Sequence, residues 1–498
     1  MNSRLRRVIL GVRAMAVAVS LFGVAACGGA ELEEERPWTA TWVDCAWSAD
    51  AEVQQPAECA EVQVPLNHDD PAAGEFTLRV KRRPAVGTAR AQLWLLAGGP
   101  GDAATEQMAS LLGGIEVERT DIDIYAVDHR GTGGSGKLVC DSQDLKLCAE
   151  ELSGTANNAL PFITTTQSAR DIQWLIQRLG QDKQVFIYGG SYGTYLAQRY
   201  LQVDAARPSG VILEGVATAE RPIAHYDAAM NAKGKALLDR CGRDPACSSH
   251  FGSADPWGVA VETVQALEDG HCPELGMTGD DLRATLGSLD IITQFLPLIP
   301  PLIAQIHRCA PADVERVQHF MAVHAAVDAE SQGSSAILGA HIAVSELAAM
   351  DADASELETA RRSHVFSSGI ELTMASIAGE WPSYVPDEHV GKWSSYQGPM
   401  LMLQGAIDPA SPVENAQRVS EHYSAPHQTL VIFPDASHTV NGATPTRSGG
   451  DCAKQLYLSF LRNPQRTPDV GCMDELLPLN FEESELSSVF FDTAQLWP

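Results

Sequence analysis

Short apolar runs recur in two parts of the chain, and stretches with a helical pattern separate them. The runs are apolar at nearly every position, which is typical of strands buried on both faces of a parallel sheet. Residues 172–179 instead place apolar side chains three and four positions apart, and Gly180 ends that helical pattern. The chain is therefore predicted to form an α/β fold, a mostly parallel central sheet flanked by helices. The predicted strands are residues 93–96, 122–127, 185–188, 211–213, 400–403 and 430–433.

Three further stretches do not follow this pattern of short apolar strands separated by helices. Residues 60–82 alternate apolar and polar positions around a set of turn-forming residues, which predicts a β-hairpin. Residues 217–390 are rich in Ala, Leu and Gln and lack paired strand runs, so we expect a mostly helical cap inserted between two strands. The core then consists of residues 42–216 and 391–498, and we expect the acidic final stretch, 474–498, to be peripheral.

The first 27 residues resemble an export signal. Four arginines precede an apolar run over residues 14–26, which is too short for a permanent membrane span. Small residues then precede Cys27, as in bacterial lipoprotein signals, whose cysteine is lipidated and becomes the first mature residue. We expect a signal peptide over 1–27, a tether over 28–41, and a lipid-anchored protein on the periplasmic or outer face of the cell envelope. Ordinary signal cleavage, with Cys27 incidental, and release from the cell are the alternatives.

The cysteines also indicate export. The chain has 11 cysteines, and setting Cys27 aside leaves an even number. Exported proteins meet oxidising conditions, so we expect five disulfides between sequence neighbours, although spacing leaves other pairings open. No C-x-x-C or H-E-x-x-H pattern occurs, so the sequence predicts no metal site. The expected pairs are Cys45 and Cys59, Cys140 and Cys148, Cys241 and Cys247, Cys272 and Cys309, and Cys452 and Cys472.

Composition narrows the range of partners. A 45% apolar chain of 498 residues forms a large core, and its formal net charge is −29. Such a chain repels phosphate backbones, so we expect no nucleic-acid partner. No cofactor is predicted, contact with a membrane is expected through the lipid anchor alone, and oligomeric state is left undetermined.

Ser191 is the residue with the clearest chemical signal. It lies in the pattern G-x-S-x-G, directly after the predicted strand 185–188 and before a helical pattern that starts near Tyr195. A strand followed by this turn and a helix exposes a serine hydroxyl as a nucleophile. A serine hydroxyl is a weak nucleophile at neutral pH and needs an adjacent base with a group that orients it. The sequence therefore predicts a serine hydrolase.

Asp408 and His438 follow later strands in the order this chemistry requires. Asp408 lies in the loop after the predicted strand 400–403, and His438 lies after the predicted strand 430–433. The order Ser191, Asp408, His438 matches the serine, acid, histidine order of α/β-hydrolases. We predict that His438 is the base and that Asp408 orients it.

An oxyanion hole is predicted after the first buried strand. Gly98, Gly99, Pro100 and Gly101 follow residues 93–96, and glycine lets backbone N–H groups approach a reacting carbonyl. We assign one donor to the N–H of Gly99, with Gly98 as the alternative, and the other to the N–H of Tyr192.

Together these motifs resemble the proline-iminopeptidase and tripeptidyl-aminopeptidase branch of the α/β-hydrolases. Gly98 to Gly101 is similar to the glycine–proline oxyanion loop of that branch, and Asp128 to Ser135 resembles its D-x-R-G-x-G-x-S loop. Cys59 to Leu66 and Asp451 to Cys472 are similar to terminal regions of the tripeptidyl group. The resemblance implies an α/β-hydrolase fold with a helical cap and a TAP-like C-terminal part.

The resemblance also implies a substrate. In such exopeptidases acidic side chains bind the free α-amino group, and Glu346 is our candidate, with Glu214 second. Ala97 stands where proline iminopeptidases carry His, which weakens the case for proline specificity. We therefore predict an aminopeptidase that releases N-terminal residues or short peptides through a covalent acyl-enzyme. The alternatives are a carboxylesterase acting on small esters and a surface lipoprotein that retains the fold as a binding module.

Overall fold

The computed structural model describes residues 40–47, 56–111, 119–142, 144–154, 159–180, 182–220, 223, 225–252, 255–329, 333–348, 353–438 and 440–498. Cys27, the predicted signal peptide and nearly all of the predicted tether lie outside these residues, so lipidation stays a prediction. The described residues belong to one structural unit, Ala40–Pro498.

A nine-stranded sheet forms the centre of this unit. Its spatial order is β1-β2-β3-β5-β4-β6-β7-β8-β9. The pairs β1–β2, β2–β3 and β3–β5 are antiparallel, and every other neighbouring pair is parallel. The strands are β1 (Val43–Ala46), β2 (Pro56–Pro65), β3 (Glu75–Arg83), β4 (Ala91–Leu96), β5 (Ile122–Val127), β6 (Gln184–Gly190), β7 (Gly210–Glu214), β8 (Met400–Gly405) and β9 (Gln428–Phe433).

The six predicted strands and the predicted hairpin are confirmed, but the prediction that residues 430–433 are buried on both faces is wrong, because β9 is the edge strand of the sheet and Leu430 and Ile432 are only half-buried. All six residues of β4, β5 and β8 are buried, because helices cover both faces of the parallel part of the sheet. The register places Leu96 beside Gly189 and Gly405 beside Phe433. The carboxyl ends of β4, β6, β8 and β9 therefore lie along one edge of the sheet, where α/β proteins place their ligand sites.

Helices of the core connect and follow these strands. The predicted helix ending at Gly180 is α4, whose first turn is capped by Thr164, since its side chain accepts from the N–H of Gln167 at 3.1 Å. The helices of the core are α1 (Ala104–Leu111), α3 (Leu145–Gly154), α4 (Thr165–Leu179), α5 (Tyr192–Val203), α15 (Val413–His422) and α16 (Cys452–Arg462), with the 3-10 turns η2 (Pro71–Ala73), η3 (Leu160–Phe162) and η8 (Gly471–Glu475).

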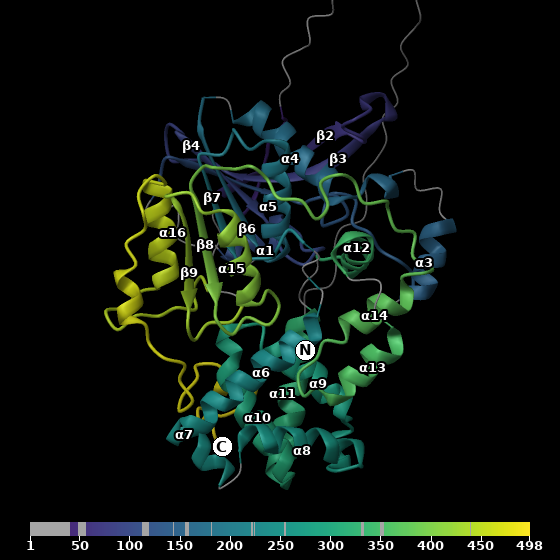
Figure 1. Cartoon of the computed structure of the whole chain (residues 1–498), viewed down its shortest axis with the longest axis vertical. Helices are drawn as coiled ribbons and strands as arrows, with labels where there is room; N and C mark the ends of the chain where they lie inside the picture. The colour runs from purple at the N-terminus through teal and green to yellow at the C-terminus, as the bar shows by residue number, and fades with distance from the viewer. Residues whose placement is uncertain are drawn as a thin grey trace, which may run out of the picture. The chain divides into compact units, whose positions relative to one another are not determined.

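The described residues between β7 and β8 form helices without a strand, and we call this segment the cap. In Figure 1 the helices α6 to α11 lie below the sheet, on the side to which the arrows of β8 and β9 point. The elements of the cap are α6 (Tyr226–Arg243), α7 (Pro245–Ser248), η4 (Ser249–Phe251), α8 (Pro256–Glu268), η5 (Pro273–Leu275), α9 (Gly279–Leu289), η6 (Thr293–Leu298), α10 (Ile299–Arg308), α11 (Pro311–Ala329), α12 (Ala336–Ile342), the π-helix η7 (Ala343–Leu347), α13 (Ala354–Ser363) and α14 (Ile370–Ile377).

The expectation that the final stretch is peripheral is wrong for its last residues. Phe481, Phe490, Phe491 and Leu496 are buried, and they belong to the same hydrophobic core as the cap helices. The short helix α17 (Ser487–Phe490) packs against α11, and the ring of Phe490 lies 4.9 Å from that of Phe320. The chain therefore passes from cap to core and finally returns to complete the core of the cap.

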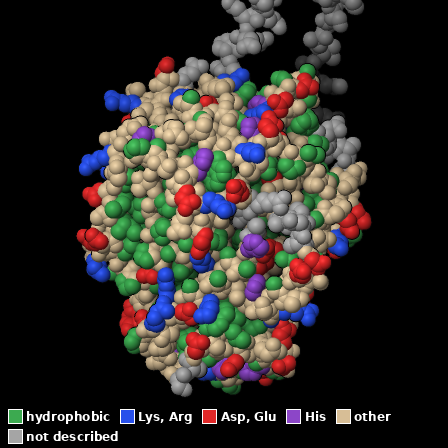
Figure 2. Space-filling model, in the orientation of Figure 1, with side chains coloured by type: hydrophobic (Ala, Val, Ile, Leu, Met, Phe, Trp, Pro, Cys, Tyr) green, Lys and Arg blue, Asp and Glu red, His purple; other side chains and the backbone are tan. Residues whose placement is uncertain are grey.

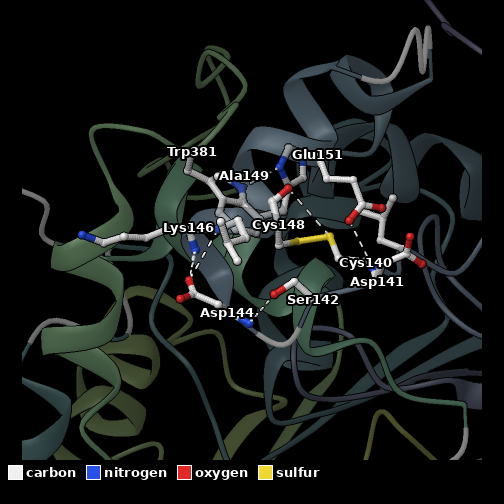
Figure 3. Close-up of a disulfide and its surroundings, with 12 residues drawn as sticks. Cys140, Asp141, Ser142, Asp144, Lys146, Cys148, Ala149, Glu151 and Trp381 are labelled. Carbon is white, nitrogen blue, oxygen red and sulfur yellow. Dashed lines mark hydrogen bonds between the residues drawn. A yellow bond between two sulfur atoms is a disulfide. The ribbon is translucent and has the colours of Figure 1, made fainter.

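Five disulfides join the cysteines into the pairs that spacing favoured. Figure 3 shows the bond between Cys140 and Cys148, which ties the loop before α3 to that helix. The N–H of Asp141 donates to Glu151 at 3.1 Å across the same loop. Cross-links of this kind persist in oxidising surroundings, as expected of an exported protein.

The surface carries charge of both signs. Figure 2 shows Asp and Glu side chains interspersed with Lys and Arg over the face that it presents. Within the part of the chain that the structure describes, every helix is too short or too polar to cross a membrane.

Candidate active site

Ser191 lies on the tight turn between β6 and α5. Its backbone has φ 55° and ψ −124°, a left-handed conformation that non-glycine residues rarely adopt. The turn persists because neighbouring groups hold it: the N–H of Ser191 donates to the carbonyl of Glu214 at 2.9 Å, and Thr194 Oγ1 donates to the carbonyl of Ser191 at 2.7 Å. Strain of this kind is typical of a nucleophile presented on a sharp strand-to-helix turn.

Gly193 allows this turn to pack against β4. A Cβ atom at position 193 would lie 2.1 Å from the carbonyl oxygen of Leu96, closer than real atoms come. Any side chain there would push α5 away from the sheet and displace the serine. This contact explains physically why the pattern G-x-S-x-G ends in glycine.

Asp408 and His438 meet at the ends of β8 and β9. Asp408 Oδ2 lies 2.8 Å from His438 Nδ1, and the carboxylate is fully buried. Because an ionised carboxylate only accepts, Nδ1 carries the proton and Nε2 is the nitrogen left to act as base. His438 and Ser191 line the same cavity, so the structure brings together the three residues predicted from sequence.

The carboxylate of Asp408 is itself held in place. Its Oδ1 accepts from the N–H groups of Ala410 at 2.9 Å and Ser411 at 2.8 Å, and its Oδ2 also accepts from Gln404 Nε2 at 2.8 Å. These bonds fix the orientation of the group that orients the base. Gln404 follows the apolar run of β8 directly, and the sequence prediction did not single it out.

Neighbouring charges set the protonation of His438. Burial lowers the pKa of His438, but the carboxylates of Asp408 and Glu214 outweigh burial and raise that pKa above its usual value. A raised pKa makes the ring a better proton acceptor once it is neutral, which suits a general base.

The cap holds the loop that bears His438. The N–H of His438 donates to the carbonyl of Ile291 at 3.0 Å, and the N–H of Ser437 donates to Thr293 Oγ1 at 2.9 Å. Ser437 Oγ donates to the carbonyl of Asp290. The segment from α9 to η6 therefore fixes the base directly, a role for the cap that the sequence did not predict.

The two predicted oxyanion donors lie at the ends of neighbouring strands. The N–H of Tyr192 is the first of α5, and the first N–H groups of a helix have no acceptor within that helix. Gly99 follows β4, the parallel neighbour of β6, and it lines the cavity with Ser191. Both positions suit donors to a carbonyl held at Ser191.

The cavity beside Ser191 has a volume of about 370 Å³. Among the described residues that line it are two carboxylates, those of Asp102 and Glu214, and neither Lys nor Arg. A larger cavity of about 640 Å³ borders the C-terminal segment and includes no residue of the triad. The charge around Ser191 therefore favours a ligand with a positive group near the reacting carbonyl.

Glu346, the first candidate for binding the substrate amino group, does not suit that role. Its Oε2 forms a buried ion pair with Arg199 Nη2 at 3.0 Å and accepts from Tyr195 at 3.2 Å, and its Oε1 accepts from Tyr384 at 2.7 Å and from Thr165. It is also absent from the described lining of the cavity. The guanidinium of Arg199 already neutralises the negative charge of Glu346 inside the protein. Because Arg199 lies on α5 and Glu346 lies on η7, this ion pair joins the cap to α5.

Glu214, the second candidate, lines the cavity but already has protein partners. Its Oε1 accepts from the N–H groups of Val440 at 2.8 Å and Asn441 at 2.9 Å, and its Oε2 accepts from Tyr188. Val440 and Asn441 follow His438 closely in the chain, so Glu214 holds the histidine loop.

Asp102 is the residue that sequence reasoning missed. It directly follows Gly101, the last residue of the glycine–proline loop, and this position is the one feature of the sequence that could have pointed to Asp102. Ser334 Oγ donates to Asp102 Oδ1 at 2.8 Å, and burial raises the pKa of Asp102 although hydrogen bonds from Ser334 and Gln107 oppose the rise.

A cluster of possible metal ligands occurs elsewhere among the described residues. Cys272, Glu274 and Cys309 lie close together, but the two cysteines are joined in a disulfide and offer no thiolate. The triad chemistry needs neither a metal nor a cofactor.

Two family models match the chain. The model described as alpha/beta hydrolase fold matches residues 95–233, and the one described as TAP-like protein matches residues 366–472. The first match contains Ser191 and the oxyanion loop, and the second contains Asp408 and His438.

Curated relatives match parts of the chain. A tripeptidyl aminopeptidase of Streptomyces lividans is 27% identical over 217 residues, which cover 38% of this chain and 40% of that protein. The serine protease Hip1 of Mycobacterium tuberculosis is 26% identical over 300 residues, covering 53% of this chain and 56% of Hip1. Carboxylesterase B of M. tuberculosis is 35% identical over 100 residues, 19% of each chain. The chain thus matches about half the length of its curated relatives or less.

Two solved structures resemble the chain at low identity and low TM-score. A proline iminopeptidase of Mycobacterium smegmatis is 15% identical with a TM-score of 0.38, covering 81% of this chain and 98% of that one. An esterase of Thermogutta terrifontis is 15% identical with a TM-score of 0.34, covering 82% and 99%.

Proposed function

Because this chain is an α/β-hydrolase with a TAP-like C-terminal region, we propose that it is a serine exopeptidase acting on free amino ends of peptides. It removes N-terminal residues or short peptides outside the cytoplasm, through a covalent acyl-enzyme. The observation that carries the proposal is the lining of the cavity, where two carboxylates and no described Lys or Arg surround Ser191. An ammonium group close to the scissile bond satisfies that charge.

The positions of the three residues support an acylation step. Ser191 Oγ attacks the carbonyl carbon while His438 Nε2 takes its proton, and Asp408 stabilises the resulting imidazolium. The oxyanion of the tetrahedral intermediate accepts from the N–H groups of Gly99 and Tyr192. When it collapses, His438 returns the proton to the leaving amine, and the C–N bond breaks.

Deacylation repeats these steps with water. Water attacks the acyl-enzyme as His438 takes its proton, and when the second intermediate collapses the bond from the acyl carbon to Ser191 Oγ breaks, the acid product leaves, and His438 returns the proton to Ser191 Oγ. The same steps cleave an ester, so the triad alone does not separate a peptidase from an esterase. The short stretch shared with carboxylesterase B supports an esterase as the second candidate.

Three substrate types separate the two functions. We expect turnover of free-amino peptidyl anilides to exceed that of their N-acetylated versions and of p-nitrophenyl acetate in kcat/KM. Ser191→Ala, which removes the nucleophile, should abolish all three activities. Hydrolysis of esters and blocked peptides without hydrolysis of free-amino peptides would contradict the exopeptidase and favour the carboxylesterase.

A further inference from the structure

We propose that Asp102 binds the α-ammonium group of the residue whose carbonyl Ser191 attacks, so that the enzyme releases N-terminal residues one at a time. This inference rests on the proposed exopeptidase function. It adds the residue that recognises the amino group and the length of the released product.

Asp102 lies beside the nucleophile. The space that a Cβ atom on Gly98 would occupy lies 3.0 Å from Ser191 Cβ and 3.5 Å from Asp102 Oδ2. Both side chains line the cavity, and the N–H of Asp102 donates to the carbonyl of Gly98 at 3.3 Å. The loop that supplies the oxyanion donor therefore also holds the carboxylate of Asp102. This carboxylate lies close enough to Ser191 to contact the amino group of a single residue bound there.

The charge of Asp102 has no matching cation in the described part of the protein. Its hydrogen-bond donors, Ser334 and Gln107, are both neutral side chains. A partly buried carboxylate without a cation is costly, and a substrate ammonium supplies the missing charge. By contrast, Glu346 has Arg199 as its partner, and both oxygens of Glu214 accept from the protein.

The position of Asp102 also limits the length of the released product. In any acylated serine, the α-nitrogen of the cleaved residue is bonded to the carbon next to the carbonyl, so it stays beside Ser191. Each additional residue before the scissile bond moves the free amino group away by up to about 3.6 Å. A carboxylate adjacent to the nucleophile therefore meets the ammonium of a single residue and not that of a tripeptide.

Asp102→Asn tests the recognition of charge. Asn keeps the size of the side chain and one oxygen acceptor but removes the negative charge. The substrates are alanine p-nitroanilide and propionyl p-nitroanilide, which differ only in the amino group. We expect the wild type to prefer the alanyl substrate. In the variant, the ratio of kcat/KM for the alanyl substrate to kcat/KM for the propionyl substrate should fall by about 30- to 100-fold. Turnover of the propionyl substrate should change by less than about threefold, since it lacks the group Asp102 binds.

Glu262→Gln is the matched control, because it removes one charge from an exposed position of α8. It should leave the alanyl preference unchanged. If Asp102→Asn lowered both activities equally, or left the preference intact, the assignment of Asp102 would be wrong. The wild type alone also tests it, because equal turnover of the two substrates would exclude recognition of the amino group.

Alanyl-alanyl-alanine p-nitroanilide tests the product length. Release of single residues predicts free alanine and alanyl-alanine p-nitroanilide by mass spectrometry, with a lag before nitroaniline appears. Immediate nitroaniline together with intact tri-alanine would overturn release of single residues but leave the exopeptidase standing. Cleavage of N-acetylated substrates alone would overturn the proposed function itself, so the two failures are distinguishable.

Discussion

At the scale of single residues, the environment of a carboxylate decides its role. Glu214 and Asp102 both line the cavity of Ser191, yet Glu214 accepts from two backbone N–H groups that follow His438. It also contributes, after Asp408, to the raised pKa of His438. Glu214 therefore positions the base and tunes its protonation, whereas the charge of Asp102 faces the substrate space.

Glu214→Gln should move the pH dependence of activity. His438 acts as a base only when neutral, so kcat/KM falls as the pH drops through its raised pKa. Removing the negative charge of Glu214 lowers that pKa, and the acid limb of the profile should move to lower pH by less than about one unit. The measurement is kcat/KM of propionyl p-nitroanilide against pH. A limb that stays in place or moves to higher pH would contradict this coupling.

Residue roles were predictable where they depended on sequence order. Ser191, Asp408 and His438 each follow an apolar strand, so their meeting at one sheet edge follows from parallel pairing. The ion pair of Glu346 with Arg199 does not support the predicted role of Glu346, and sequence could not reveal it because Arg199 lies on a different element and only the folded chain brings the two together. Asp102 was missed because its significance comes from its approach to Gly98.

At the scale of elements, the nucleophile helix α5 is tied to the cap. Arg199 on α5 pairs with Glu346 on the π-helix η7, and both side chains are almost completely buried. Tyr192, the residue after the nucleophile, donates to Thr165 at 2.9 Å, because the single hydroxyl proton of Thr165 is donated to Glu346. Patterns of apolar residues predict the helices but carry no signal for this π-helix or for the buried pair that it forms with α5.

Arg199→Ala should destabilise the protein strongly. It leaves the carboxylate of Glu346 buried without its cation, which typically costs about 3–5 kcal/mol. The free energy of unfolding in urea measures the effect. The double variant Arg199→Met with Glu346→Leu removes both charges and should be less destabilised than Arg199→Ala alone. If Arg199→Ala lowered the free energy of unfolding by less than about 1 kcal/mol, water or another group would have to replace the arginine as the partner of Glu346.

At the scale of the whole molecule, the order of segments differs from their arrangement in space. The cap lies between β7 and β8 in the chain, but its hydrophobic core also includes Phe490 and Phe491 from the end of the chain. The acidic composition of residues 474–498 predicted a peripheral tail. In this segment, exposed residues such as Glu482 and Glu483 outnumber the few buried aromatic side chains. Composition is an average over a segment, so it does not reveal a few buried aromatic residues among many exposed acidic ones.

Phe490→Ala should lower the free energy of unfolding by about 3–5 kcal/mol. Its ring packs against those of Phe295 at 5.3 Å and Phe320 at 4.9 Å, so truncation leaves a cavity inside the cap. Val489→Ala, at the neighbouring position with 50% exposure, is the control and should change stability by less than about 0.5 kcal/mol. Similar small effects for both variants would mean that the C-terminal segment contributes little to the cap.

The return of the last residues to the cap has a consequence for biosynthesis. A chain emerges from the ribosome with its N-terminus first, so the strands from β1 to β7 are available to pair early. The cap helices are complete long before Phe481, Phe490 and Leu496 are made, and until then their shared apolar surface stays uncovered. Because that cap carries the carbonyls that hold the loop of His438, we expect the base to be fixed in place only after residues 481–496 have been synthesised and have packed against the cap.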